Sequence, residues 1–375
     1  MTLFLFLKQI VDIFYQYKSL DYLMVIFALF LLVYQFMLVR PDIRKRLTLS
    51  DGMIVVIALH VTMIFFRNIT NYGVYFKTMS AFLMFFIGRI YYDRIKESTG
   101  ALVYAAYIVV YGNLVWRFIH FGINLFKINN AYGDLYYQDT DMAFAMILAM
   151  TFIIMYGHNT LFKYITSFVV CPLMVFTSDA GIQMTLMIAV LCVIFMYILE
   201  LLVEKPRVAN ILLTLVIVGL LALVVVIYLP VFDILPDRMV VNLFGGRFLD
   251  NDNMYGRYEV WKSIVRDFKG QDLNSQIFGI SLVDNENFGS LYIKLLYSLG
   301  YFGILMALML IANLIFYIIR VNDRKTFYMC VMLAVMLFGT GVTVCSMDFT
   351  QMSWFPMMFA GMVVSSVQVE RDEKE

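Results

Sequence analysis

Long apolar runs separated by short polar gaps dominate this chain. Runs such as 22–39 and 209–229 are at least 18 residues long and carry no charged residue. A helix of this length crosses a hydrocarbon layer about 30 Å thick while satisfying its own backbone polar groups. The pattern therefore predicts an all-α fold, a polytopic transmembrane helical bundle of about eleven spans. The spans are expected at residues 22–39, 52–66, 74–92, 101–123, 142–157, 162–177, 181–200, 209–229, 300–319, 326–345 and 354–368.

The composition agrees with a protein that lies in lipid. Hydrophobic residues make up 62% of the chain and charged residues 15%, whereas soluble domains average about 45–50% and about 25%. A net charge of +1 argues against nucleic acid as a partner. The four cysteines lie singly in or beside apolar runs, and the three histidines stand at positions 60, 120 and 158. We therefore expect no disulfide framework, no metal site and no cofactor.

Alternate gaps between the apolar runs are rich in Lys and Arg, which is typical of cytoplasmic loops. Their basic residues are Arg40, Arg44, Lys45, Arg46, Arg94, Lys96, Lys163, Lys205, Arg207, Arg320, Arg324, Lys325, Arg371 and Lys374. This alternation predicts a multi-pass protein of the cytoplasmic (inner) membrane with a cytoplasmic C-terminus. Residues 2–17 would add a twelfth span and bring the N-terminus inside, but Lys8 and Asp12 favour a helix at the membrane interface instead.

One connection in the single membrane domain 1–375 is far longer than the others. Residues 230–299 leave and return on the expected outer side, and long loops in compact proteins are usually functional. Two segments of this loop, near 254–268 and 290–299, are amphipathic, and we expect both to be helices on the membrane surface. The apolar faces comprise Tyr258, Trp261, Ile264, Val265 and Phe268 in the first segment and Leu291, Tyr292, Leu295, Leu296 and Leu299 in the second. Gly300 then lets the chain turn into the next span.

The loop carries arginines that directly follow glycines. Arg247 follows Gly245 and Gly246, and Arg257 follows Gly256. A guanidinium group makes a planar, permanently charged, bidentate fit to phosphate oxygens, so these two arginines are the first candidates for binding a diphosphate. Arg238 and Arg266 are weaker candidates. The alternative is contact with lipid headgroups or with acidic residues of the same loop.

The turn DNEN supplies two carboxylates to the same loop. Asp284 or Glu286 is a candidate general base towards a sugar hydroxyl, because a carboxylate near the reacting oxygen is what glycosyl transfer commonly needs. The alternative is that both are solvated loop residues.

A few polar residues lie within the apolar runs. Arg117 and His120 are three residues apart near the outer end of their span, where they are candidates for an anionic headgroup or diphosphate and, alternatively, interfacial anchors. Arg89 is expected to extend towards the cytoplasmic interface. His60 is expected to be a packed residue with its polar atoms satisfied.

In its layout and in parts of the long loop, the chain resembles a superfamily that comprises the polytopic O-antigen ligases and the Wzy-type polymerases of O-antigen and capsular polysaccharide. The layout is similar, with one large outer loop before the last three spans. The segments that carry the local resemblance are GRYEVW at 256–261, IFGIS at 277–281 and SLYIKLLYSLGYFG at 290–303. Tyr292 and Ile293, eight and seven residues before Gly300, resemble a family pattern. Ligases of the superfamily carry a histidine followed by asparagine where this chain has Gly289 and Ser290, so the resemblance favours a polymerase.

The resemblance implies a GT-C-like fold and a metal-independent glycosyltransferase. Its activity would be transfer of a growing glycan from a polyprenyl diphosphate to the terminal sugar of another lipid-linked repeat unit, on the outer face of the membrane. Its partners would be the lipid-linked oligosaccharide donor and acceptor, membrane lipids, and a flippase and a chain-length regulator. An O-antigen ligase, a flippase or transporter, and a non-catalytic assembly protein remain as alternatives.

Overall fold

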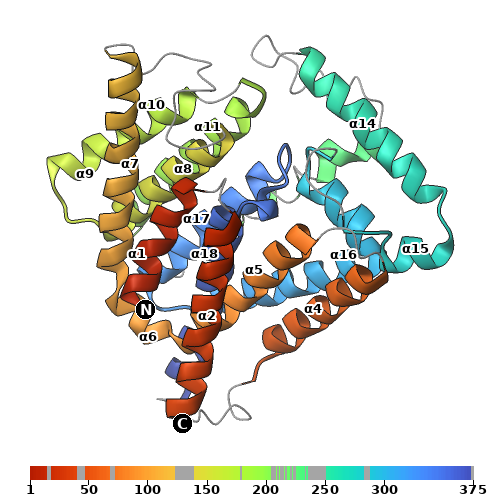
Figure 1. The fold of residues 1–375 in the computed structure, drawn as a ribbon, viewed down its shortest axis with the longest axis horizontal. Coiled ribbons are helices and arrows are strands. Elements are labelled where there is room, and N and C mark those ends of the chain that lie inside the picture. Colours follow the sequence, from red (N-terminus) through yellow and green to blue (C-terminus); the bar gives the residue numbers. More distant parts are fainter. Residues whose placement is uncertain are drawn as a thin grey trace.

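A computed structural model shows an all-helical protein, with no strand among the residues that it describes (Figure 1). The described residues are 1–14, 18–39, 47–67, 72–122, 139–177, 180–203, 225–232, 234, 251–282 and 288–372, together with single positions between 208 and 222.

Five of the described helices are long and apolar enough to cross a membrane. They are α4 (Leu49–Arg67), α5 (Tyr72–Ile90), α7 (Thr99–Phe121), α16 (Leu291–Ile318) and α18 (Thr350–Asp372, apolar over Thr350–Val369). Each overlaps one of the runs predicted to span the membrane, so the expected helical membrane bundle is confirmed at this level.

The other predicted runs also fall on helices where the structure describes them. These helices are α2 (Lys18–Val39), α8 (Asp139–Tyr156), α9 (Leu161–Ile165) with η2 (Thr166–Val170) and α10 (Cys171–Phe176), α11 (Ala180–Leu202) and α17 (Arg324–Thr340). Over the residues that the structure describes, apolar helices of 10–17 residues lie at Ser19–Gln35, Thr140–Tyr156, Leu161–Phe176 and Ala189–Leu202. Short elements complete the chain: η1 (Asp12–Phe14), α6 (Tyr92–Glu97), η3 (Leu229–Phe232), α14 (Asn251–Lys269), α15 (Leu273–Phe278) and η5 (Ser346–Asp348).

The first helix, α1 (Thr2–Val11), is not an interfacial helix on the outside of the bundle. Phe4 and Leu5 are almost fully buried, and the Phe4 ring stacks on Trp354 of α18 with 6.4 Å between centroids. Thr2 shares a hydrogen bond of 2.7 Å with Ser98 at the start of α7. The expectation from Lys8 and Asp12 was wrong because these two charges neutralise each other inside the protein, where they form a buried ion pair.

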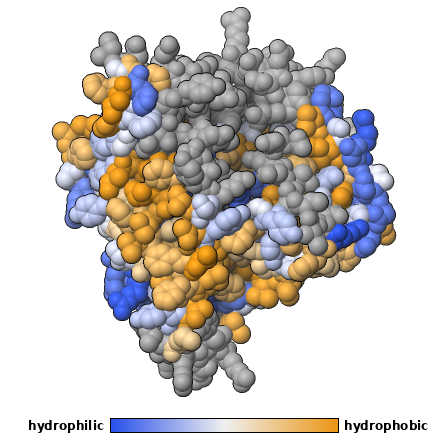
Figure 2. Space-filling model, viewed as in Figure 1, coloured by the Kyte–Doolittle hydropathy of each residue, from blue (hydrophilic) through white to orange (hydrophobic). Residues whose placement is uncertain are grey.

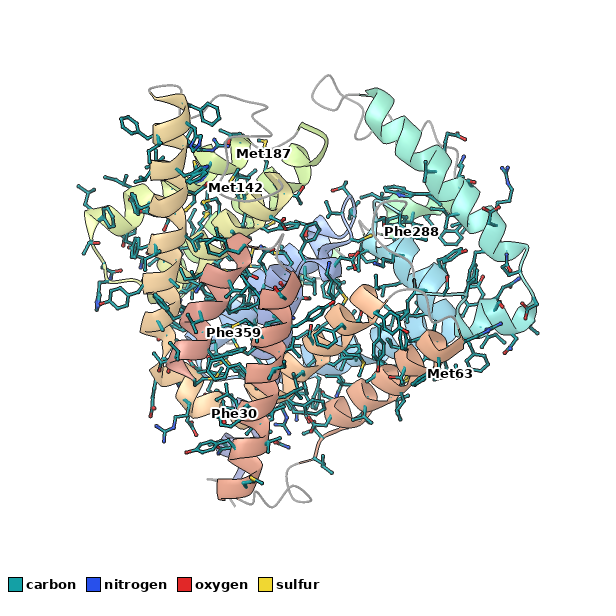
Figure 3. The ribbon with its side chains drawn as sticks, in the orientation of Figure 1. Phe30, Met63, Met142, Met187, Phe288 and Phe359 are labelled. Atoms are coloured by element: carbon teal, nitrogen blue, oxygen red, sulfur yellow. The ribbon has the colours of Figure 1, made fainter. Side chains whose placement is uncertain are left out.

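Helices α5 and α18 pack very closely against each other. A Cβ atom added to Gly361 would lie 2.1 Å from the Phe85 carbonyl oxygen, and one added to Gly88 would lie 1.9 Å from the Met358 carbonyl oxygen. Only glycine allows such an approach of two backbones, and small residues commonly have this role between membrane helices. Phe359, in the middle of the bundle, is fully buried beside this contact (Figure 3).

The two faces of the bundle helices differ as expected for a protein in lipid. Figure 2 shows apolar side chains over the middle of the visible face and hydrophilic ones over α14 and near α6. Phe30 and Met63, on α2 and α4, are 61% and 50% exposed and belong to this apolar surface (Figure 3). A surface with many exposed apolar side chains is suited to contact with lipid rather than with water.

Candidate functional site

The loop before the last three spans folds onto one end of the bundle, and we call it the cap: η3, α14, α15 and residues 288–299. The predicted amphipathic helix near 254–268 is confirmed as α14. Trp261, Val265 and Phe268 are at most 2% exposed, whereas Glu259 and Arg266 are exposed. The apolar face packs against other cap residues, so the expectation that it rests on the membrane surface was wrong for this face.

The cap has a hydrophobic core separate from that of the bundle. Trp261 is fully buried in this core, and its Nε1 donates a hydrogen bond of 2.7 Å to the carbonyl oxygen of Phe288. Phe288 is labelled in Figure 3. The ring of Tyr228 lies 5.3 Å from that of Trp261. Ile293 and Leu296, from the first turns of α16, complete the contact with α14. The predicted helix near 290–299 is therefore also confirmed, as the first part of α16.

This first part of α16, residues 291–299, is fixed to the last turn of α17 and to the connection between α17 and α18. The Leu291 backbone N–H donates to the Gly341 carbonyl at 2.8 Å, and the Tyr292 hydroxyl donates to the Phe338 carbonyl at 2.7 Å. Lys294 Nζ lies 2.6 Å from both carboxylate oxygens of Asp348 in η5. Lys294 is 6% exposed and Asp348 is 7% exposed. The ion pair is thus desolvated and lies where the cap meets the bundle.

A sharp bend at Gly300 joins this segment to the rest of α16. Gly300 has φ 64°, and a Cβ atom there would lie 2.4 Å from the backbone nitrogen of Gly279. The bend interrupts the helix, and two carbonyls near it find partners outside it: that of Tyr297 accepts from the Ile280 N–H at 3.0 Å, and that of Leu299 from His60 Nε2 at 3.0 Å. His60 is buried and hydrogen-bonded, as its packing role predicted.

The short helix α15 fills the angle between the bend and the end of α4. Arg67 donates to the Ser275 hydroxyl at 3.1 Å and to the Gly279 carbonyl at 3.5 Å. Asp272 caps α15 by accepting from the Ser275 hydroxyl at 2.6 Å and from its N–H at 3.2 Å, and these hydrogen bonds lower the pKa of Asp272. The cap is therefore attached to the bundle at α4 as well as at η5.

Charged groups inside the bundle gather around the start of α18. Lys8 Nζ pairs with Asp12, donates to the Thr350 hydroxyl at 3.0 Å and lies 4.4 Å from the centre of the Trp354 ring. The Thr350 hydroxyl also donates to Asp12 at 3.2 Å. Asp141 of α8 is fully buried and interacts electrostatically with this pair.

The two polar residues predicted near the end of α7 lie in different environments. Arg117 is 1% exposed and points into the protein, as does Asn113 one turn earlier. Trp116 and His120 are exposed, and a His120 ring nitrogen is 2.9 Å from the Trp116 carbonyl oxygen. An interfacial anchor therefore describes Trp116 and His120, while Arg117 is a buried cation.

Arg89 does not extend to the interface as expected. Its guanidinium forms two hydrogen bonds of 3.0 Å with Asp51 of α4 and further bonds with Ser365 and Gln368 of α18. The Arg89 side chain is 9% exposed and that of Asp51 5%. A carboxylate on a neighbouring helix was within reach, so burial with a partner was favoured over extension to water.

The remaining predicted site residues are only partly placed. Arg238, Arg247, Asp284 and Glu286 lie outside the described residues, and for Arg257 the structure describes the backbone, within α14, but not the side chain. Arg266 is exposed on the same helix. Two ion pairs, Lys294–Asp348 and Lys8–Asp12, were not anticipated from the sequence. For the second, the spacing i, i+4 between opposite charges on a helix was a usable signal.

The described residues contain no group of three His, Cys, Asp or Glu side chains that could hold a metal ion. What the arrangement offers is a folded cap, a desolvated ion pair beneath it, and a buried arginine near one end of α7. No protein-family model, curated protein or solved structure matches this chain.

Proposed function

We propose that this chain is a polysaccharide polymerase with about eleven spans and a GT-C-like arrangement, in the cytoplasmic membrane. The Lys- and Arg-rich gaps would be cytoplasmic and the cap would face the other side. The contact of Thr2 with Ser98 places the start of α1 beside the Arg94 and Lys96 gap. In this topology α1 would enter the bundle from the cytoplasmic side and would count as a twelfth span, which would bring the N-terminus inside.

The observation that carries the proposal is the folded cap. A loop that only connects two spans needs no core of its own and no desolvated ion pair to the bundle. Trp261 and the Lys294–Asp348 pair give the cap both. A fixed outer cap suits a reaction between two lipid-linked substrates, because their reacting groups emerge at the membrane surface and must be held in one geometry.

The arginines would bind the diphosphate of the donor and neutralise the charge that develops as it leaves, a task usually worth several kcal/mol. Helical periodicity separates two of the candidates. By the helical period, position 257 falls one turn before Trp261 on α14, whereas Arg266 is exposed. Arg257, with Arg247, remains the first choice, and Arg117 is a buried cation that could stabilise the same charge from the bundle.

The base would come from the DNEN turn, with Glu286 or Asp284 accepting the proton of the acceptor hydroxyl. The residues on either side of 283–287 support this choice. Leu282 belongs to the bundle core and Phe288 to the cap core, and each is 4% exposed. The two residues that flank the turn thus belong one to each core, and donor and acceptor would come together between these cores.

Chain extension by the purified protein on a polyprenyl-diphosphate-linked oligosaccharide tests the proposal directly. Arg257→Ala is expected to lower the extension rate by about a hundredfold or more, while Arg266→Ala, the matched change on the exposed side of the same helix, should have little effect. Equal activity of the Arg257→Ala variant and the unmodified protein would contradict the proposed site.

A deletion strain separates the polymerase from its alternatives. Loss of a polymerase leaves single repeat units, loss of a ligase leaves long chains on the carrier lipid, and loss of a flippase leaves repeat units on the cytoplasmic side. The polymerase proposal also expects a flippase and a chain-length regulator among its partners.

A further inference from the structure

Arg67, the last residue of α4, is an exposed cation at the place where the cap meets the bundle. Both of its hydrogen bonds go to neutral groups, the Ser275 hydroxyl at 3.1 Å and the Gly279 carbonyl at 3.5 Å. None of the ion pairs among the described residues includes Arg67. The nearby carboxylate of Asp272 uses both of its oxygens to bind Ser275. A guanidinium group has five N–H donors, so Arg67 keeps donors for a further anion.

An exposed apolar stripe on α4 leads up to this cation. Val56, Leu59, Met63 and Phe66 are 40%, 65%, 50% and 68% exposed, and their spacing of three or four residues places them on one face of the helix (Figure 3). Arg67 follows Met63 by one turn, so it lies at the end of the same face. Ten residues of helix are about 15 Å long, which is half of a hydrocarbon layer about 30 Å thick. The stripe is therefore as long as one leaflet is deep.

The short helix α15 continues the apolar surface beyond Arg67. Leu273 and Phe278 of this helix are 72% and 36% exposed, and Ser275 between them binds Arg67. The Phe278 ring lies 6.2 Å from that of His60 on α4, so the two helices are neighbours. Arg67 thus has exposed apolar side chains on two sides. A cation at the edge of an apolar layer is where the phosphate of a lipid headgroup makes its strongest contact.

We infer that Arg67 binds the phosphate of a phospholipid with a net negative charge, and that one acyl chain of this lipid lies along Val56, Leu59, Met63 and Phe66. The uncompensated charge of Arg67 favours an anionic headgroup over a zwitterionic one, because the latter brings a second cation to the same place. The length of the stripe matches a chain that stays within one leaflet. A soluble phosphate would use the cation but not the stripe. This site goes beyond the proposed transferase and does not depend on it.

Thermal unfolding of the purified full-length protein in a neutral detergent tests this site without any measurement of transferase activity. The probes are phosphatidylglycerol and phosphatidylcholine with identical acyl chains, glycerol phosphate and a polyprenyl phosphate, and unfolding is followed by tryptophan fluorescence. Phosphatidylglycerol is expected to raise the Tm by about 3 °C at about a hundredfold its Kd, because it binds only the folded state. Glycerol phosphate should have no effect, and phosphatidylcholine should raise the Tm by less than half as much.

Four variants separate the headgroup contact from the chain contact. Arg67→Gln removes the charge and should lose most of the shift, whereas Arg94→Gln, at another exposed arginine, should keep it. Phe66→Ala shortens the stripe and should reduce the shift, whereas Phe30→Ala, at a ring of similar exposure on α2, should not. Equal shifts with the two phospholipids, or a full shift in both Arg67→Gln and Phe66→Ala, would overturn the inference. A larger shift with the polyprenyl phosphate than with phosphatidylglycerol would overturn the assignment to a phospholipid.

Discussion

The bundle and the cap bury apolar side chains for different reasons. In lipid, separating two apolar helices costs little, so membrane helices associate through close packing, small residues and internal polar contacts. The bundle shows these features in the Gly88 and Gly361 contact and in the Arg89–Asp51 pair. The cap, by contrast, carries a charged face on α14 and a compact core around Trp261, which is the pattern of a structure stabilised by exclusion of water. Substitutions that remove side chains of equal volume should therefore affect the stability of the two regions differently.

The largest effect is expected at Trp261. Trp261→Ala removes the largest side chain of the cap core and the hydrogen bond to Phe288, at a cost of about 3–5 kcal/mol. The cap should unfold locally while the bundle persists. Hydrogen exchange measured by mass spectrometry should then become fast in peptides from 259–299 and remain slow in 350–368. Ser263→Ala, on the exposed side of the same helix, is the control. Equal acceleration in both regions would mean that cap and bundle form one cooperative unit.

Much of the division between bundle and cap could be predicted from the sequence, because it depends on local periodicity. The apolar runs located the helices, and the spacing of Trp261, Val265 and Phe268 identified the buried face of α14. What that face contacts could not be predicted, since an apolar stripe looks the same whether protein or lipid covers it. The burial of Arg117 could not be predicted for the same reason: how deep a side chain lies depends on the neighbouring helices, so it was expected as an interfacial anchor or anion ligand.

The ion pairs were missed for a different reason. Lys294 and Asp348 are 54 residues apart, and Arg89 and Asp51 are 38 residues apart. Only tertiary packing brings such partners together, and a single lysine in an amphipathic segment reads as an exposed residue. The Gly300 bend was anticipated as a turn, but its partners His60 and Gly279 come from two other segments.

The stability of the contact between cap and bundle should depend on Lys294. Lys294→Met leaves the Asp348 carboxylate buried without its cation, which typically costs about 3–5 kcal/mol. The double variant Lys294→Met with Asp348→Leu should recover most of this loss, because an apolar pair of similar volume often replaces a buried ion pair at little cost. Chemical denaturation of the single and double variants gives the coupling energy. Additive losses would show that the pair does not hold cap and bundle together.

Inside the bundle, the close approach of α5 and α18 predicts a smaller loss. Gly361→Ala places a Cβ atom 2.1 Å from the Phe85 carbonyl oxygen, so the two backbones must separate at a cost of about 1–3 kcal/mol. Gly112→Ala is the matched control, because a Cβ atom there meets nothing within 4 Å and alanine favours the helix by about 0.5–1 kcal/mol. Thermal unfolding should therefore shift in opposite directions for the two variants. A stabilised Gly361→Ala variant would contradict the tight packing.

The smallest expected effect lies at the opposite end of the bundle from the cap, where Lys96 of α6 is 2.9 Å from Asp323 before α17. Burial opposes ionisation of Asp323, but the hydrogen bonds from Lys96 and Thr326 outweigh it and lower the pKa of Asp323, while the same contact raises the pKa of Lys96. An acid whose pKa is lower in the folded state stabilises the fold above its unfolded pKa and loses this contribution as the pH falls below about 4.

Since Lys96 is 53% exposed, the contribution should stay below about 1 kcal/mol. It is measurable as the difference in acid unfolding between the unmodified protein and Asp323→Asn, which should be less stable at neutral pH and converge with the unmodified protein in acid. Glu97→Gln is the control, because the Arg94–Glu97 pair spans 3.6 Å with both side chains about 70% exposed and should contribute nothing measurable. A difference that grows in acid would reverse the sign and show that Asp323 is destabilising when ionised. The cost of burying the Asp323 carboxylate would then exceed the benefit of its contact with Lys96, as expected for a group inside the bundle rather than at a solvated surface.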